Sequence, residues 1–266
     1  MREALDGNGF QLYAQPILSL VDGTVSSSEI LLRLISPDGT VIEPDEYLPL
    51  AERFGLIREI DQWVVRRSFA VLREQLAANP DARVEVNLSG LSIGDSDLEA
   101  LVREEMAVGD VPPGAMVFEI TETAAIVDLA VADAFTRRIA DLGCHWALDD
   151  FGVGFSSFLY LMKLPFSYVK IDGSFVRDLM SSERDRLVVR AIVEVAHSLG
   201  QMTIAEFVED AETMSILREL GVDFAQGYYI GRPQPSSQPA KAAAPELDAA
   251  TPSSISEASL GHCHVD

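Results

Sequence analysis

The sequence predicts an α/β fold, and within that class a (β/α)8 TIM-like barrel with an irregular antiparallel first strand. The chain has 266 residues, close to the ~250 residues typical of such a barrel. Its 48% hydrophobic and 23% charged content suits a full core and excludes disorder throughout. Short apolar runs alternate with longer segments of helical spacing, which indicates a mainly parallel sheet covered by helices.

The opening of the chain departs from that alternation. Two apolar segments, Phe10–Leu18 and Ser27–Leu34, are separated by the turn Val21-Asp22-Gly23-Thr24, which predicts an antiparallel hairpin. Strand-like runs then recur along the chain, each short, apolar and bounded by polar or glycine residues. They are Arg83–Leu88, Met116–Ile120, Trp146–Asp149, Tyr168–Ile171, Met202–Ala205 and Phe224–Gln226.

Segments between these runs carry apolar residues at helical spacing. In the longest, residues 58–78, Ile60, Trp63, Val64 and Leu72 belong to one broad apolar face. The expected helices cover 45–54, 58–78, 96–107, 125–142, 156–162, 184–199 and 210–220. The alternation of strands and helices continues after the hairpin, which favours a barrel with an irregular first strand. No internal sequence repeat is evident.

The charge balance excludes several partners. Lys and Arg number 20 against 42 Asp and Glu, which gives a formal charge of -22. This charge repels a phosphate backbone, so the sequence argues against nucleic acid and anionic membrane. A small anionic ligand remains possible where metal ions or local basic residues reverse the field in a pocket.

The composition predicts one domain over residues 1–235 and a flexible Ser/Ala/Pro-rich tail over 236–266. His262-Cys263-His264 in the tail is interpreted as incidental, since three adjacent ligands cannot all face one ion in a relaxed chain.

Cys144 and Cys263 form no disulfide framework and suit a reducing compartment. The sequence shows neither a signal peptide nor an apolar stretch of ~18 residues. We therefore expect a cytoplasmic protein without a membrane span in this chain.

Residues able to bind metal or move a proton stand at or just after nearly every strand end. They are Glu29, Asn87, Glu119, Asp149 with Asp150, Lys170 with Asp172, Glu206 with Glu209, and Gln226. Carboxyl ends of parallel strands meet at one mouth of a barrel, which is where these folds carry out chemistry. Any one of these residues alone has an ordinary structural explanation, such as a turn, a helix cap or a solvated surface position. Their recurrence along the chain favours a site.

The chemistry of this set indicates divalent metal. Carboxylates gathered in one pocket cannot all stay ionised without cations between them, and oxygen ligands suit Mg²⁺ or Mn²⁺. Adjacent Asp149 and Asp150 could bridge two ions. Two ions ~3.5–4 Å apart would activate water for a phosphoryl displacement, with Lys170 orienting the water or neutralising charge. The residues therefore favour metal-assisted hydrolysis of a phosphate ester.

Ordered motifs over roughly residues 8–235 resemble the EAL-domain cyclic di-GMP phosphodiesterases of bacteria, which hydrolyse cyclic di-GMP to linear pGpG. The matching segments are Tyr13–Ile17, Glu29–Arg33, Leu48–Glu52, Val86–Ser89, Phe118–Glu122, Asp149–Ser157, Leu164–Pro165, Val169–Asp172, Ala205–Glu209 and Gln226–Tyr228. A three-letter motif would be weak evidence, but this many segments in order are specific.

The resemblance implies a role for each matching position. The metal ligands would be Glu29, Asn87, Glu119, Asp149, Asp150 and Glu206, holding two ions. Lys170 is similar to the lysine that contacts the nucleophilic water, and Gln226 to a group beside the catalytic site or substrate. The substrate-binding positions would be Arg33 on a phosphate, Gln15, Asn87 and Asp172. Glu122 and Glu209 would support the site, and Gly152 and Gly154 would let the loop after Asp150 bend toward the metals.

The chain departs from the family pattern at several positions. Ile30 stands where the signature has Ala, Val153 and Phe155 replace the usual Thr and Tyr, Phe207 replaces a frequent Gly, and Leu34 a frequent Trp. Ile30 should be tolerated because it points away from Glu29 on a strand. The other changes bear on rate, affinity and regulation. None removes an expected metal ligand.

Three functions remain to be distinguished. The leading one is a cyclic di-GMP phosphodiesterase that lowers the level of this second messenger. The second is a catalytically silent cyclic di-GMP receptor that signals to a partner, and the third is an unrelated barrel hydrolase of another phosphate ester. The resemblance also implies a homodimer formed through helices beside the loop after Asp150, and a fused or associated cyclase or sensor domain.

Overall fold

The computed structural model describes residues 1–7, 9–121, 128–152 and 157–236. Most of the predicted tail, the start of the helix expected over 125–142, and Glu122 lie outside the described residues. The predicted boundary at residue 235 coincides with the last short strand, β10 (Gln234–Pro235), and the division into a domain and a tail stays a prediction.

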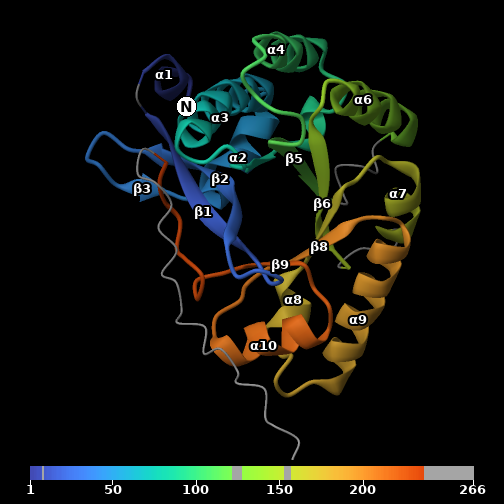
Figure 1. Ribbon diagram of the computed structural model, residues 1–266. Helices are drawn as coiled ribbons and strands as arrows, with labels where there is room; N and C mark the ends of the chain where they lie inside the picture. The colour runs from blue at the N-terminus through green and yellow to red at the C-terminus, as the bar shows by residue number, and fades with distance from the viewer. Residues whose placement is uncertain (8, 122–127, 153–156, 237–266) are drawn as a thin grey trace, which may run out of the picture.

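A closed barrel forms the centre of the molecule (Figure 1). Strands β4 to β9 are parallel to one another in chain order, and β2 is parallel to β4. The first strand, β1, pairs antiparallel with both β2 and β9 and thereby closes the ring. The ring consists of β1 (Phe10–Ser19), β2 (Val25–Ile35), β4 (Val84–Asn87), β5 (Met116–Thr121), β6 (His145–Phe151), β7 (Tyr168–Ile171), β8 (Met202–Ala205) and β9 (Phe224–Gln226). The predicted barrel and its irregular first strand are confirmed.

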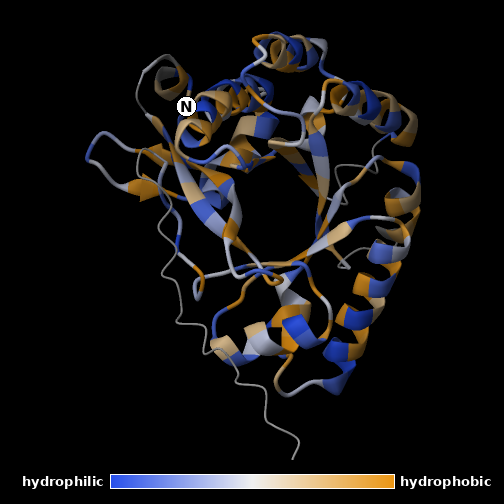
Figure 2. Ribbon diagram, in the orientation of Figure 1, coloured by the Kyte–Doolittle hydropathy of each residue, from blue (hydrophilic) through white to orange (hydrophobic). Residues whose placement is uncertain are grey.

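Helices surround the barrel (Figure 1), and Figure 2 shows hydrophobic and hydrophilic stripes along them. They are α2 (Pro44–Arg53), α3 (Ile57–Ala78), α4 (Ser96–Ala107), α6 (Leu129–Asp141), α7 (Ser157–Lys163), α9 (Glu183–Ser198) and α10 (Ala211–Glu219). Side chains of Asp95, Asp128, Ser182 and Asp210 accept hydrogen bonds from the first backbone N–H groups of α4, α6, α9 and α10. For α4, α9 and α10 these caps explain why the helices begin within a residue of where the sequence predicts them to begin.

Several short elements are absent from the sequence-based prediction. They are α1 (Arg2–Asp6), β3 (Val41–Ile42), the 3₁₀ turn η1 (Gly90–Ser92), α8 (Gly173–Val176) and β10. Each is too short for hydrophobic periodicity to reveal it. Two of them follow strand ends, η1 after β4 and α8 after β7, and they therefore shape the rim of the barrel.

Apolar side chains fill both sides of the barrel wall. The larger core lies between the strands and the helices and includes Phe69, Phe118, Phe135 and Trp146, all fully buried. A second cluster fills the interior: Ile17, Val117, Ala147, Tyr168, Ile204 and Phe224. Tyr168 and Phe224 are the first residues of β7 and β9. Apolar side chains therefore fill the barrel interior at the amino ends of the strands, and the polar residues lie near the carboxyl ends.

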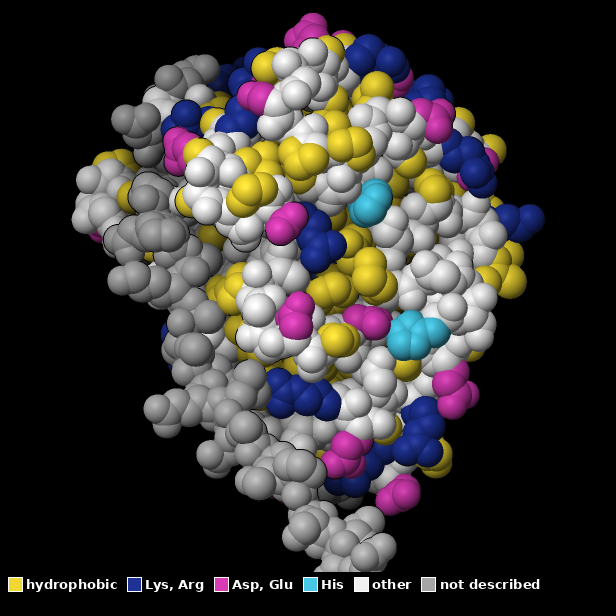
Figure 3. Space-filling model, viewed as in Figure 1, with side chains coloured by type: hydrophobic (Ala, Val, Ile, Leu, Met, Phe, Trp, Pro, Cys, Tyr) yellow, Lys and Arg dark blue, Asp and Glu magenta, His cyan; other side chains and the backbone are white. Residues whose placement is uncertain are grey.

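The face seen in Figure 3 carries acidic and basic side chains interspersed with apolar ones. The negative charge of the chain is therefore not gathered into one patch on this side. No helix in the described part of the chain is long and apolar enough to cross a membrane.

Candidate metal centre and ligand cavity

A buried lysine stands at the centre of the acidic site. Lys170 lies on β7 with 1% of its side chain exposed, and its Nζ is 2.7 Å from Glu119 Oε2 and 2.9 Å from Glu206 Oε1. Asp149 Oδ1 follows at 3.2 Å and Glu29 Oε2 at 3.7 Å. These acids come from β5, β6, β2 and the residue after β8. The prediction that the strand ends meet at one place is confirmed for this group.

Amides orient Glu29. Asn87 Nδ2 donates to Glu29 Oε1 at 2.6 Å, and Gln226 Nε2 donates to Glu29 Oε2 at 2.6 Å. Gln226 Nε2 also lies 3.2 Å from Gln15 Oε1, while Gln15 Nε2 donates to the Gly231 carbonyl. Both oxygens of Glu29 are thus held by hydrogen bonds from amide groups.

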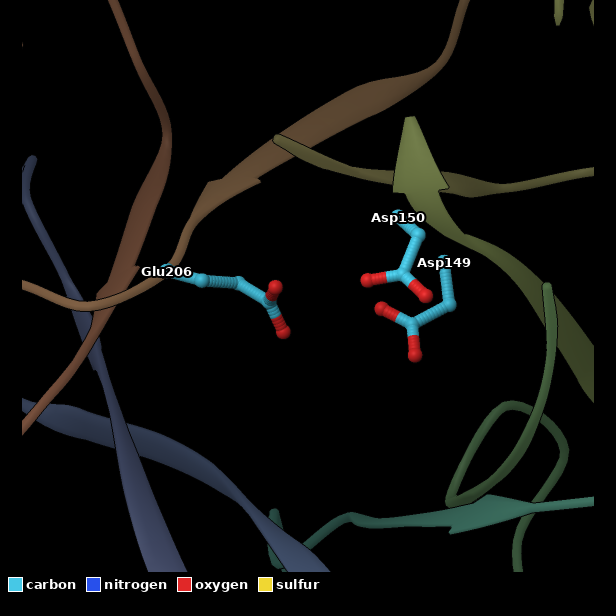
Figure 4. Close-up of side chains that lie close together, drawn as sticks. All are labelled: Asp149, Asp150 and Glu206. Carbon is cyan, nitrogen blue, oxygen red and sulfur yellow. The ribbon is translucent and has the colours of Figure 1, made fainter. Parts of the chain in front are cut away.

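A backbone irregularity brings Asp149 and Asp150 to the same site. Successive side chains of a regular strand point to opposite faces, so adjacent aspartates would diverge. Here the register between β6 and β7 shifts between Leu148 and Phe151, and Asp150 has a positive φ of 54°. That left-handed conformation is uncommon for a residue other than glycine, although Asp tolerates it better than most. It turns the Asp150 carboxylate toward that of Asp149, and Glu206 points at both (Figure 4).

Burial and mutual repulsion disturb the proton affinities of these groups. Burial raises the pKa of Glu206 to about 8 and, together with repulsion from Asp149 and Asp172, raises the pKa of Asp150 to about 6. Burial likewise raises the pKa of Glu119 well above its usual range. Burial opposes the charge of Lys170, but the surrounding carboxylates outweigh it and hold the lysine pKa well above its ordinary value. Lys170 therefore stays charged and is the one buried cation of the described site.

The donor set fits a hard divalent cation. Oxygens of Asp149, Asp150 and Glu206 all lie within 4.8 Å of one another. Glu119 Oε1 is buried without a hydrogen-bond partner among the described residues. Asp149 Oδ1 is also buried and makes an ion pair with Lys170 at 3.2 Å but no hydrogen bond. A cation would satisfy the remaining acceptor capacity of both atoms. Every candidate ligand is an oxygen, which suits Mg²⁺ or Mn²⁺ better than a thiol- or imidazole-binding metal.

A cavity of about 360 Å³ adjoins the acidic cluster. Among the residues predicted from sequence, Gln15, Glu29, Arg33, Glu206, Glu209 and Gln226 line it. Carboxylates and the guanidinium groups of Arg33 and Arg177 therefore line the same space. The cavity has room for a phosphorylated ligand next to the acidic residues.

Aromatic and basic residues on the cavity wall were not predicted. Phe207 and Tyr228 are 47% and 54% exposed and line the cavity with Arg177. Arg177 stacks on Phe207 at 4.4 Å, and Arg232 stacks on Tyr228 at 4.1 Å. In the sequence, the only sign of this wall is that Phe207 stands where the family frequently has Gly. Sequence alone does not show that the rings of Phe207 and Tyr228 line one cavity.

Phe207 adopts a backbone conformation that normally favours glycine. Its φ is 55°, and its ring lies over Gly173, where a Cβ would approach within 2.2 Å of the ring. Gly173 thus makes room for the ring. The strain at Phe207 is held by packing, and it places a large aromatic face at the edge of the metal site.

Some predicted residues lie apart from the cluster. Asp172 accepts a hydrogen bond from Ser174 N and caps α8, and it does not line the cavity. Glu209 lines the cavity and makes no hydrogen bond or ion pair with any other described residue. Glu122, Val153 and Phe155 lie outside the described residues, so their expected supporting roles stay predictions.

The fold and site together define a barrel protein with an acidic, metal-type centre at the carboxyl ends of its strands. The family model of the EAL domain matches residues 1–233, and the chain belongs to the EAL domain family. It is 40% identical over 234 residues to cyclic di-GMP phosphodiesterase PdeB of Shewanella oneidensis, a match covering 88% of this chain and 27% of that protein. The chain thus spans about a quarter of that relative's length.

Solved structures agree with this assignment. The PaMucR phosphodiesterase in complex with c-di-GMP is 34% identical with a TM-score of 0.83, and the match covers 89% of this chain and 96% of that one. The FimX EAL domain of Pseudomonas aeruginosa bound to c-di-GMP is 33% identical with a TM-score of 0.81, covering 88% and 94%. The likeness includes both the barrel and the strands that carry the acidic site.

Proposed function

We propose that this domain is a metal-dependent phosphodiesterase that hydrolyses cyclic di-GMP to linear pGpG. The observation that carries the proposal is the convergence of Glu29, Glu119, Asp149 and Glu206 on Lys170, beside a cavity that holds Arg33. The names of PdeB and of the PaMucR complex support the substrate and the reaction.

The acidic residues would hold two divalent ions, which supply Lewis acidity and an activated water when bound. Glu29, Asn87, Glu119 and Asp149 would hold the first ion, and Asp149 and Asp150 the second, with Glu206 beside it. We propose Mg²⁺ or Mn²⁺. The buried Glu119 Oε1, which has no hydrogen-bond partner among the described residues, supports this assignment.

Lys170 would position the attacking water and stabilise negative charge on the oxygens of the reacting phosphate. Its ammonium is fixed by carboxylates on several sides, so the charge is aimed before the substrate arrives. Water would attack one phosphorus in line, the 3′-oxygen would leave with a proton, and the product would keep a 5′-phosphate. Gln226 supports the geometry through its hydrogen bond to Glu29.

Arg33 would bind a substrate phosphate, since a planar guanidinium offers paired donors to an anion. Phe207 and Tyr228 would contact the guanine bases with their exposed faces. Arg177, Arg232 and the metal ions would offset the negative charge of the chain at this one place. We also propose that Gln15 and Asp172 lie on the substrate side of the site. Asp172 would act through Asp150, because its charge helps to raise the pKa of the Asp150 carboxyl.

The second candidate is a receptor that binds cyclic di-GMP without turnover and signals to a partner. The FimX complex shows that an EAL domain of similar structure binds the ligand. Loss of a metal ligand would favour a receptor, but every described ligand position of this chain carries an oxygen donor. The complete set therefore favours the enzyme.

We propose further that the domain forms a homodimer and works with a cyclase or sensor domain in the bacterial cytoplasm. Exposed Phe158, Leu159 and Met162 on α7 support the dimer, because this helix follows the loop after Asp150. The buried free thiol of Cys144 suits a reducing compartment. The bifunctional cyclase/phosphodiesterase MucR of Pseudomonas aeruginosa, 34% identical, supports a cyclase partner.

Chromatography of cyclic di-GMP incubated with the purified chain tests the proposed function. Parallel samples contain Mg²⁺, Mn²⁺ or chelator. Appearance of pGpG that chelator abolishes would support the enzyme. Bound but unchanged cyclic di-GMP in all samples would favour the receptor, and turnover of an unrelated phosphodiester in its place would favour the third function.

A further inference from the structure

An acidic residue outside the metal centre contacts Arg33, one of the two arginines that line the cavity. Glu43 Oε2 lies 3.0 Å from Arg33 Nε. The two side chains differ in exposure, with 11% of Arg33 and 59% of Glu43 accessible. The pair therefore joins a nearly buried cation on the cavity wall to an acid at the protein surface.

The backbone fixes where Glu43 sits. It is the residue before Pro44, and a residue before proline is confined to extended conformations; its φ and ψ are -75° and 153°. Glu43 stands at the N-cap of α2, yet its side chain makes no capping hydrogen bond. The carboxylate is thus held at the helix start and is directed to Arg33 instead.

The remaining contacts of Arg33 leave one edge of its guanidinium for a ligand. Nη1 donates to the Leu32 carbonyl at 2.9 Å, and the group lies 5.7 Å from the centre of the Tyr13 ring. Nη2 makes no hydrogen bond with any described residue. With Glu43 at Nε and Leu32 at Nη1, the guanidinium has a fixed plane, and Arg33 lines the cavity.

We propose that Glu43 is a positioning residue that orients Arg33 so that its Nη edge receives a phosphate of the substrate. This inference rests on the proposed function and names a residue that acts through Arg33 without touching the ligand. A preorganised guanidinium loses less conformational freedom on binding than a free one. The opposite role, in which Glu43 competes with phosphate for Arg33, predicts the reverse effect on affinity.

Calorimetry of cyclic di-GMP binding in chelator, with KM and kcat measured separately in Mn²⁺, tests this role. The variants are Glu43→Ala, Glu43→Gln, Arg33→Ala and the control Glu46→Ala. Glu46 is exposed, belongs to the first turn of the same helix and makes no ion pair with a described residue. Its removal changes the local charge equally without touching Arg33. Thermal melting shows whether each variant is folded.

We expect Glu43→Ala to weaken binding and raise KM about 3- to 10-fold with little change in kcat. The melting temperature should change little, because the Glu43 carboxylate is 59% exposed and an ion pair with a solvated partner contributes little to stability. Glu43→Gln keeps an acceptor for Nε and should stay within about 2-fold of wild type, as should Glu46→Ala. Tighter binding by both Glu43 variants would show competition and overturn the proposal. Equal effects of Glu43→Ala and Glu46→Ala would show that only the local negative charge affects binding. That result would also overturn the proposal.

Failure of the wild-type chain to bind or cleave cyclic di-GMP would reject the proposed function and this inference together. Binding by the wild type that Arg33→Ala and Glu43→Ala leave unchanged would reject the inference alone. The two failures are therefore distinguishable in one set of experiments.

Discussion

The ammonium of Lys170 lies 2.7 Å from the carboxylate of Glu119, and both side chains are almost completely buried, at 1% and 0% exposure. An isolated charge at this depth would be strongly unfavourable. The pair is tolerated because three further carboxylates surround the same ammonium. The site is therefore an electrostatic unit in which changing one member alters the proton affinity of the others.

Replacing Lys170 should abolish most turnover while the fold is retained. Lys170→Ala removes the buried positive charge that would face the reacting phosphate, and we expect a loss of at least about 100-fold in kcat. Without metal, the Lys170→Ala variant should also melt at a lower temperature at pH 8 than at pH 5. At pH 5 the acids that have lost their buried cation can take up protons, which reduces their mutual repulsion. Lys163→Ala, at an exposed position of α7, is the matched control. Unchanged turnover of Lys170→Ala in saturating metal would contradict the role assigned to the lysine.

Asp61 should make the stability of the protein fall as pH rises. Burial within α3 raises the pKa of this carboxyl from 3.8 to about 7, with partial compensation from Ser92 and the backbone N–H of Ser89. A folded-state pKa above the unfolded value means that stability is fully present below about pH 4 and is lost as pH rises through 7. The loss attributable to this group is at most about 4 kcal/mol.

Denaturant unfolding of metal-free wild type and Asp61→Asn at intervals between pH 4 and 8 measures this effect. The amide keeps an acceptor for Ser89 and cannot ionise, so its unfolding free energy should fall less across the range. Parallel curves for the two proteins would show that Asp61 does not titrate in this interval.

Phe207 should contribute to ligand affinity more than to stability. Phe207→Gly relieves about 1 kcal/mol of backbone strain at its positive φ and removes the aromatic face beside Arg177. We expect a Kd for cyclic di-GMP about 5- to 20-fold higher with a melting temperature close to that of wild type. Phe54→Gly, another exposed phenylalanine but one outside the cavity, should leave the Kd unchanged. Equal affinities of Phe207→Gly and wild type would show that the ring does not contact the ligand.

The proposed dimer should depend on α7. Met162 is 64% exposed, beside exposed Phe158 and Leu159, and a charge introduced there would be buried in an interface between copies. Light scattering after size exclusion should give a dimer for wild type and a monomer for Met162→Glu. Val21→Glu, at an exposed position in the β1–β2 turn, should remain dimeric. A wild-type chain that is monomeric at high concentration would rule this dimer out.

Much of the fold could be predicted because its signals are local. Apolar runs such as Tyr168–Ile171 and Met202–Ala205 end where predicted, and the turn around Gly23, with its φ of 72°, joins the antiparallel strands. The convergence of Glu119 and Glu206 also followed from strand order, since parallel strands end at one mouth. Glu29 lies in the middle of β2 (Val25–Ile35) and reaches the site because the parallel pairing of β2 with β4 ends at Ile30.

Other features depend on backbone geometry that the sequence does not display. The bulge at Asp149 and Asp150 overrides strand alternation, and the stack of Arg177 on Phe207 joins two loops of the cavity rim. The pairing of Arg33 with Glu43 likewise needs the placement of α2 against β2. Asp172 follows the end of β7 and was therefore predicted to belong to the site, but in the structure its side chain caps α8.

Hydrolysis in ¹⁸O-labelled water tests the central claim most directly. Wild-type chain, cyclic di-GMP and Mn²⁺ should yield pGpG with one ¹⁸O atom in its 5′-phosphate, and chelator or Glu29→Ala should stop product formation. Cyclic di-GMP recovered intact although calorimetry shows that it is bound would contradict the account and identify a receptor. Product formed equally well by Glu29→Ala would contradict the assignment of the acidic centre.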